Sequence, residues 1–319
     1  MMHFIDHVLD GITMYKIILY GLLLCAFTAI LLGFFGLVPY RGYQYIVSFA
    51  FLLATCWVSN YVFAKLYNIP TNSESSLITG LILFFLLTPF ESSAIIPTYV
   101  LAGIFSMASK YLLSFCRKHV FNPAALTAVF LDLLGSPFIT WWVGSAAMLP
   151  FITILGFLIL RKLRRFSMFF TFAFFAILTT LLFGMVKGHS VFSVLPQIFL
   201  SFPLIFFGTV MVTEPLTTPP TNMLRLFYGG VVGVLFGSQF SIGPVFSSPE
   251  LSLVIGNVYS YFVSPKEKFL LFLKEKRKIA ADMYEFIFVP RGNLSYKAGQ
   301  YMEWTLGHAK VDIRPSCVP

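Results

Sequence analysis

The chain has 319 residues, of which 58% are hydrophobic and only 11% are charged. That composition lies far outside the range of soluble globular domains and indicates an integral membrane protein. The formal net charge of +9 would suggest nucleic acid as the partner of a soluble protein, but here the basic residues stand in short connections between apolar runs, so we expect no nucleic-acid partner.

Apolar runs follow one another from residue 17 to residue 263. A membrane crossing needs about 20 apolar residues. Seven runs reach or approach that length: 17–38, 45–67, 96–113, 141–160, 166–186, 191–212 and 224–240. Three runs are shorter: 77–87, 124–134 and 251–263. Short apolar runs beside Pro-rich connections indicate half-spanning or discontinuous helices.

The basic residues predict the topology. If all ten runs cross, most of the basic residues fall on one side: Lys65, Lys110, Arg117, Lys118, Arg161, Lys162, Arg164, Arg165 and Arg225. We therefore expect a multi-pass protein of the cell's inner (plasma) membrane with both termini in the cytoplasm. Ten helices divide into two sets of five. A repeat unit with an odd number of helices must insert its second copy with inverted topology. The predicted fold class is an α-helical polytopic membrane protein with an inverted 5+5 repeat.

Two polar motifs interrupt the apolar runs. In the first, Asn122 can cap a helix whose first residue is Pro123. Such a helix start can attract an anion such as a flavin phosphate, or it can be an ordinary cap. The second motif is a Thr- and Pro-rich break at residues 213–221, which contains Thr213, Glu214 and Thr217 and can equally be a plain loop. The four cysteines are isolated, so no metal site is predicted.

These motifs resemble the family that contains the B subunit of the sodium-translocating NADH:quinone reductase and the D subunit of the Rnf electron-transport complex. The resemblance covers roughly residues 15 to 263 and rests on five segments in order: 75–81, 87–89, 109–110, 121–124 and 211–217. It implies a ten-helix, urea-transporter-like subunit that holds flavin. The candidate cofactor residues that follow from it are Lys118, Asn122, Pro123, Thr213, Glu214 and Thr217.

One departure from that family concerns its covalent cofactor. Those subunits usually carry FMN esterified to a Thr in an S-G-A-T-type motif, and no such tetrapeptide occurs in this sequence. We therefore expect FMN or riboflavin, if bound in the membrane domain, to be held without a covalent bond.

From Lys266 on, the sequence becomes charged and alternating, as in half-buried strands, most clearly at 283–290 and 300–306. Residues 296–301 resemble the element that opens the FAD-binding barrel of ferredoxin reductases. The resemblance implies a partial β-barrel and FAD, with Tyr296, Gln300 and Tyr301 as candidate contacts. The R-x-[YF]-[ST] strand and the Gly-rich nucleotide loop do not occur, so the reductase domain is expected to be truncated and inactive alone.

The sequence thus predicts a transmembrane electron-transport domain, residues 1–264, and the N-terminal part of a flavin-binding reductase domain, residues 265–319. The leading hypothesis is a membrane oxidoreductase subunit that passes electrons from a reduced nicotinamide or flavin donor through flavin to a quinone or another acceptor, with other membrane subunits as possible partners. The alternatives are a solute or ion transporter, and a membrane anchor for a redox partner. The reductase-like tail favours the first.

Overall fold

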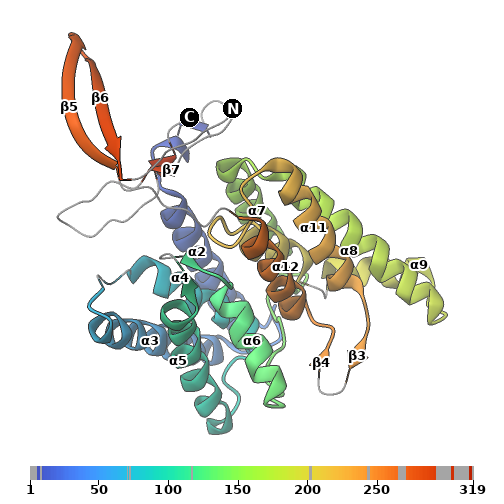
Figure 1. The fold of residues 1–319 in the computed structure, drawn as a ribbon. Coiled ribbons are helices and arrows are strands. Elements are labelled where there is room, and N and C mark those ends of the chain that lie inside the picture. Colours follow the sequence, from blue (N-terminus) through green and yellow to red (C-terminus); the bar gives the residue numbers. More distant parts are fainter. Residues whose placement is uncertain are drawn as a thin grey trace. The chain divides into compact units, whose positions relative to one another are not determined.

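The computed structural model describes residues 6–7, 9–69, 71, 73–115, 118–200, 203–242, 245–264, 271–291, 303–304 and 316–317. The chain divides into two compact units, Met1–Ser264 and Pro265–Pro319. Figure 1 shows that the regular structure of the first unit is almost entirely helical, whereas the second unit contains strands.

The first half of the helical unit has five main helices: α2 (Met14–Phe34), α3 (Gly42–Leu66), α4 (Ser73–Leu86), α5 (Ile96–Leu112) and α6 (Pro123–Leu133). A single 3₁₀ turn, η1 (Ser93–Ile95), leads into α5. Helix α3 packs on both α4 and α5, and α2 covers α3 and α4. A small hairpin of β1 (Ser114–Phe115) and β2 (Lys118–His119) connects α5 to α6.

The second half has the same kinds of element: α7 (Leu149–Leu163), α8 (Phe166–Val186), α9 (Val191–Leu200), α10 (Leu204–Phe206), the π-helical turn η2 (Phe207–Met211), α11 (Asn222–Gly237) and α12 (Pro249–Val263). A hairpin of β3 (Ser241–Ile242) and β4 (Val245–Phe246) connects α11 to α12. Helix α11 packs closely on α8: a Cβ added to Gly233 would lie 2.5 Å from the backbone oxygen of Phe172. The two halves meet where α2 contacts α7 and α6 contacts α12.

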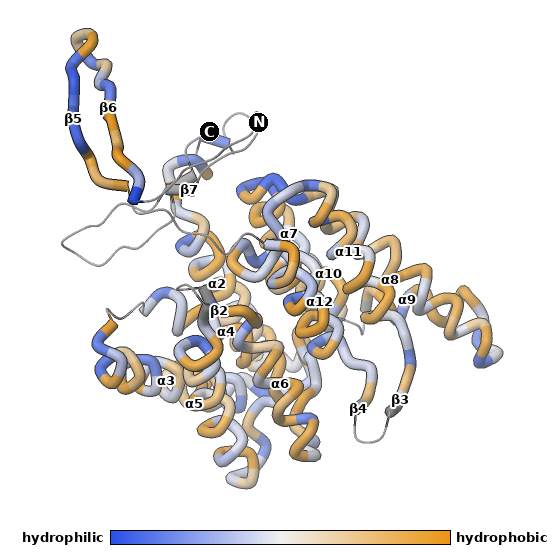
Figure 2. The backbone as a smooth tube through the Cα atoms, in the orientation of Figure 1, coloured by the Kyte–Doolittle hydropathy of each residue, from blue (hydrophilic) through white to orange (hydrophobic). Residues whose placement is uncertain are grey.

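Four helical stretches among the described residues are long and apolar enough to cross a membrane: Met14–Phe34, Gly42–Leu66, Ser93–Leu112 and Phe166–Val186. Each coincides with a run that the sequence predicts as a crossing. A fifth candidate is the pair Val191–Phe199 and Leu204–Met211, which is bent by 55°. In Figure 2 hydrophobic residues dominate these helices. The protein is therefore an α-helical membrane protein.

Two predicted crossings differ from the structure. The run 141–160 does not form one helix, because residues 141–148 are loop and turns and α7 begins only at Leu149. Trp141 has a positive φ of 47°, which no helix accommodates. The run 191–212 is bent rather than straight, since Pro203 lies between α9 and α10 and lacks the N–H that a continuing helix needs.

A chain of buried aromatic rings fills the centre of the helical unit. Consecutive ring centroids lie 4.6–6.5 Å apart. The members, in order, are Tyr45, Trp142, Phe85, Phe206, Trp141, Phe207 and Phe172. We call this set the aromatic chain. It joins α3 and α4 of the first half to η2 and α8 of the second, so the interior between the halves is packed with side chains.

The second unit contains an antiparallel hairpin of β5 (Leu271–Ala280) and β6 (Met283–Pro290). The predicted strand 283–290 is thus confirmed. Register shifts occur on either side of residues 275–278 of β5, consistent with β-bulges. A second pair joins β7 (Glu303–Trp304) to β8 (Ser316–Cys317). The described residues of the tail form two separate two-stranded sheets and not the predicted partial barrel, because two strands are too few to curve around a common interior.

Candidate functional site

The start of α6 is capped as the sequence predicts. Asn122 is in an extended conformation, with φ −62° and ψ 120°, and its side-chain oxygen accepts a hydrogen bond from the backbone N–H of Ala125 at 3.0 Å. Pro123 is the first helical residue, where its missing N–H costs nothing. The side chain of Asn122 is therefore fixed at the point where the hairpin β1–β2 enters α6.

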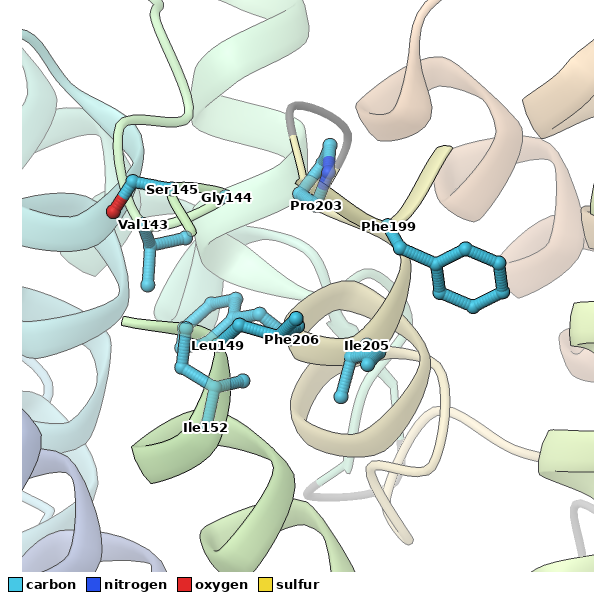
Figure 3. A pocket seen from close by; sticks show the side chains of 9 residues that line it. All are labelled: Val143, Gly144, Ser145, Leu149, Ile152, Phe199, Pro203, Ile205 and Phe206. Carbon is cyan, nitrogen blue, oxygen red and sulfur yellow. The ribbon is translucent and has the colours of Figure 1, made fainter. Parts of the chain in front are cut away.

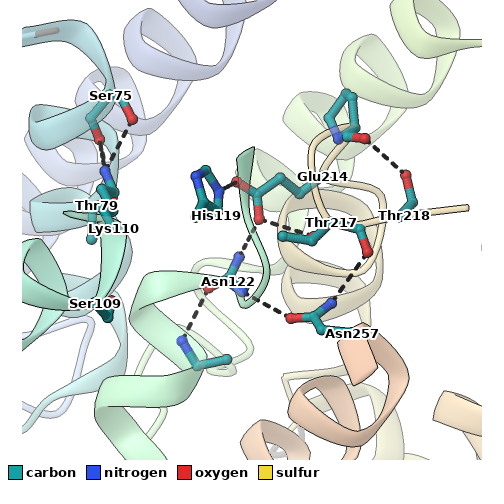
Figure 4. Close-up of polar contacts among 12 residues, drawn as sticks. Ser75, Thr79, Ser109, Lys110, His119, Asn122, Glu214, Thr217, Thr218 and Asn257 are labelled. Atoms are coloured by element: carbon teal, nitrogen blue, oxygen red, sulfur yellow. Dashed lines mark hydrogen bonds and ion pairs between the residues drawn. The ribbon is translucent and has the colours of Figure 1, made fainter. Parts of the chain in front are cut away.

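Glu214 is the acidic residue that faces this helix start (Figure 4). The amide of Asn122 donates to Glu214 Oε2 at 2.9 Å, and the hydroxyl of Thr217 donates to the same oxygen at 3.2 Å. His119 Nε2 lies 3.3 Å from the other oxygen, Glu214 Oε1. Both carboxylate oxygens therefore have partners. Those partners come from the segment 119–122 and from the 213–221 loop.

Helix α12 supports this arrangement through Asn257, which is fully buried. The side-chain oxygen of Asn257 accepts from the backbone N–H of Asn122 at 2.8 Å. Its amide donates to the hydroxyl of Tyr228 at 3.1 Å and to the backbone oxygen of Thr217 at 3.5 Å. Asn257 thus joins α6, α11 and the 213–221 loop, and it fixes Asn122 and Thr217, two of the three partners of Glu214, relative to each other.

Arg165 holds the near end of the same loop. Its Nη1 donates to the backbone oxygen of Thr213 at 3.0 Å and to the hydroxyl of Thr218. Arg165 is 7% exposed and stands at the start of α8. Because Glu214 lies between those two contacts, the guanidinium anchors the backbone that carries it.

A second polar contact lies nearby in the first half. Lys110 Nζ donates to the backbone oxygen of Ser75 at 2.9 Å and to its hydroxyl at 3.0 Å, so α5 is fastened to the start of α4 (Figure 4). Both residues belong to the segments on which the family resemblance rests.

The charge of Glu214 follows from these neighbours. Glu214 lies beyond Met211, outside the candidate spans, and its side chain is 24% exposed. Burial alone raises the pKa of its carboxyl, but the hydrogen bond and charge of His119, the charge of Lys110 and the hydrogen bond from Asn122 outweigh burial and lower the pKa below its ordinary value. Glu214 is therefore a carboxylate at neutral pH.

A small cleft opens beside this carboxylate, with a cavity volume of about 40 Å³. Its polar lining consists of Asn122, Thr213 and Glu214, with the hydroxyl-bearing Tyr15. Its apolar lining comes from α2, α4, α7 and the π-helical turn: Met14, Ile18, Ile78, Ile82, Leu163 and Val210, together with Pro215 of the loop. We call it the Glu214 cleft. It is a largely apolar recess with a few convergent polar groups, and in this conformation its volume has room for only a few water molecules.

A second recess lies at the break between α9 and α10 and is lined by Val143, Gly144, Ser145, Leu149, Ile152, Phe199, Pro203, Ile205 and Phe206 (Figure 3). Its cavity volume is about 10 Å³. Its lining is mostly apolar, and no residue that the sequence singled out as a candidate contact lies in it. It is not the candidate site.

The structure brings together three of the predicted site residues, Asn122, Glu214 and Thr217, by hydrogen bonds. Pro123 begins α6, and Thr213 lines the cleft. Lys118 lies in β2, paired with Phe115. Tyr296, Gln300 and Tyr301 lie outside the described residues. No group of His, Cys, Asp and Glu suited to a metal occurs among the residues that were placed.

Sequence reasoning missed Asn257, Tyr228 and Arg165 as parts of this cluster. A signal existed for the first of these, because Asn257 is a lone amide inside the apolar run 251–263. No sequence signal singles out His119, because its pairing with Glu214 joins two segments that are 95 positions apart.

Comparison with known protein families gives no family that matches this chain, and comparison with curated proteins gives no match either.

Proposed function

We propose that the protein is a membrane-bound oxidoreductase subunit that passes electrons from a reduced nicotinamide or flavin donor through flavin to an acceptor in the membrane. The observation that carries the proposal is the hydrogen bond of 2.9 Å between Asn122 and Glu214, which are 92 positions apart. They belong to the two most specific segments of the resemblance to the B and D subunits named above. Motifs that meet at a cleft are expected to share a ligand rather than to serve separate local roles.

The packed interior favours electrons over solutes as the species that crosses. A solute path requires a polar or water-filled route between the two halves. The aromatic chain occupies that position with buried rings whose consecutive centroids are no more than 6.5 Å apart. Electron transfer needs no such opening, so this interior is compatible with it.

The Glu214 cleft fits one part of a flavin better than another. A phosphate placed at the start of α6 would meet the carboxylate of Glu214, which already faces Asn122, and like charges repel. The apolar walls and the amide of Asn122 at the edge suit a neutral ring system better, and the walls would have to move apart to admit it, because the cleft has a volume of only about 40 Å³. Flavin would supply the electron-accepting chemistry; Asn122 would orient its ring, and Glu214 with His119 could hold a proton beside it.

The repeat and the orientation are part of the same proposal. Helix α5, the hairpin β1–β2 and α6 have the same order as α11, β3–β4 and α12, and both α6 and α12 begin with a capping residue followed by proline. This supports an inverted 5+5 repeat with ten crossings, in which short helices such as α6 and α12 complete the two halves. Basic residues on one side support cytoplasmic termini in the inner membrane. The hairpin β5–β6 is compatible with the opening strands of an FAD-binding barrel that would receive the donor's electrons.

A second candidate is solute or ion transport, and one observation favours it. Glu214 stands at a break between the π-helical turn and α11, where loose backbone beside a carboxylate is typical of transporter binding sites. The two functions predict different properties of the purified protein: an electron-transfer subunit contains flavin, whereas a transporter moves a solute into vesicles. A flavin-free protein that moves a solute into vesicles would establish the second.

The test is the flavin content of the purified full chain, released by denaturation and measured by absorbance. We expect noncovalent flavin in the native protein and a loss of about tenfold or more in Asn122→Ala, which corresponds to about 1.4 kcal/mol of binding free energy. Asn60→Ala is the matched control, because Asn60 is also buried and its side chain accepts a hydrogen bond from Tyr111, but it does not line the cleft. Equal flavin content in the two variants, or none in the native protein, would contradict the proposal.

A further inference from the structure

The segment before α2 is tied to the end of α7 by charge. The carboxylate of Asp6 accepts two hydrogen bonds from Arg161, from Nε at 2.9 Å and from Nη2 at 2.8 Å. Such a two-pronged contact fixes the direction of both side chains. Asp6 and Arg161 are 155 positions apart, so this pair joins distant parts of the chain.

Lys162 adds a second point of attachment. Its Nζ donates to the backbone oxygen of Leu9 at 2.6 Å and lies 3.9 Å from a carboxylate oxygen of Asp10. Leu9 is 6% exposed, so the segment is also held by burial of an apolar side chain. We call the contacts of Asp6, Leu9 and Asp10 with Arg161 and Lys162 the N-terminal clamp.

The clamp borders the Glu214 cleft on two sides. Met14 and Tyr15, which follow the clamped segment at the start of α2, line the cleft. Leu163, which follows Lys162 at the end of α7, lines it as well. The clamp therefore ties together two walls of the recess into which Glu214 faces, and it does so within a few residues of each wall.

We propose that the N-terminal clamp controls access to the Glu214 cleft, so that the cleft opens when its ion pairs are released. The side chains of Arg161 and Asp6 are 34% and 38% exposed, which leaves their attraction open to screening by salt. An ion pair of this exposure contributes little free energy, so an equilibrium that depends on it is easily shifted. The clamp works in the same way whatever molecule the cleft binds.

The experiment measures how fast a thiol in the cleft reacts with a water-soluble maleimide. Ile78→Cys places the thiol on α4 in the cleft wall, in the full chain with Cys116→Ser and Cys317→Ser; Cys25 and Cys56 are buried and stay. We expect Asp6→Asn to raise the labelling rate about two- to fivefold. Raising the ionic strength should raise the rate in the protein with Asp6 and have little effect in Asp6→Asn.

Two controls separate the clamp from general loosening. Arg164→Gln removes a charge from the same turn, from a residue with no ion pair among the described contacts, and should leave the rate unchanged. Asp6→Arg combined with Arg161→Asp restores an ion pair of reversed sense and should return the rate toward that of the parent. A thiol at Thr71→Cys, an exposed position, reports any global change. An unchanged rate in Asp6→Asn, or failure of the reversed pair to restore it, would overturn the proposal.

Discussion

The starts of α6 and α12 are built alike but serve different surroundings. Each begins with a capping residue followed by proline, and each cap accepts a hydrogen bond three residues on: Asn122 from the N–H of Ala125 at 3.0 Å, and Ser248 from the N–H of Leu251 at 3.2 Å. Each also has a carboxylate nearby, which complements the positive end of a helix. For α6 it is Glu214, and for α12 it is Glu250 of the helix's own first turn.

The difference between the two carboxylates lies in their access. Glu250 is 1% exposed and accepts a hydrogen bond from the indole N–H of Trp141, a member of the aromatic chain. Glu214 is 24% exposed at the edge of a cleft and is held by polar side chains from three elements. The first is sealed inside the protein and stabilises it, whereas the second can meet a ligand. A shared motif therefore does not imply a shared role.

The largest effect is expected at the sealed carboxylate. Trp141→Phe removes the indole N–H and leaves the buried Glu250 without that donor, so the free energy of unfolding should fall by about 3 kcal/mol. Reversible unfolding in mixed detergent micelles measures it. Adding Glu250→Gln should recover part of the loss, because a neutral amide costs less to bury than a charge. No recovery in the double variant would mean that the loss comes from ring packing and not from the carboxylate.

At the start of α6 we expect a smaller decrease in the free energy of unfolding. Asn122→Ala removes a helix cap, worth about 1 kcal/mol, and a hydrogen bond to a charged group, worth about 1.5 kcal/mol, so unfolding should become easier by roughly 2 to 3 kcal/mol. The bond from the backbone N–H of Asn122 to Asn257 is unaffected by this change. A double-mutant cycle with Glu214→Ala isolates the second contribution, and a coupling energy near zero would contradict the assigned contact.

The matched change at α12 sharpens the comparison. Ser248→Ala removes the cap and also a hydrogen bond to the carboxyl of Glu250, so we expect a loss of about 1 to 2 kcal/mol, smaller than the loss in Asn122→Ala. The same unfolding measurement gives both values. Equal losses at the two caps would show that the bond between Asn122 and Glu214 adds no more to stability than the bond between Ser248 and Glu250.

Much of this comparison could be predicted from sequence, but its decisive part could not. The cap at Asn122 and Pro123 follows from residue type and order, and so do the four long apolar helices. The partner of that cap could not be found, because spacing along the chain carries no information about a contact with Glu214. The start of α7 at Leu149 was also missed, since apolar residues of a buried loop look like those of a helix.

The smallest predicted effect is a pH dependence that belongs to the accessible carboxylate alone. Burial raises the pKa of Glu214, but His119 and the other partners lower it by more, so the pKa in the folded protein lies below the ordinary value of 4.5. Ionisation of Glu214 therefore stabilises the folded state above pH 4.5. This contribution is lost as the pH falls through the lowered pKa. The contribution is roughly 0.5 to 1 kcal/mol, as for a partly exposed ion pair. Glu214→Gln cannot titrate, so the decline in unfolding free energy from neutral pH to a pH below the lowered pKa should be smaller in this variant than in the parent by that amount. His119→Gln removes the cation that lowers the pKa and should flatten the same part of the curve. If both variants keep the full pH dependence of the parent, other carboxylates dominate it, and the hydrogen-bonded pair of Glu214 and His119 is not maintained in solution.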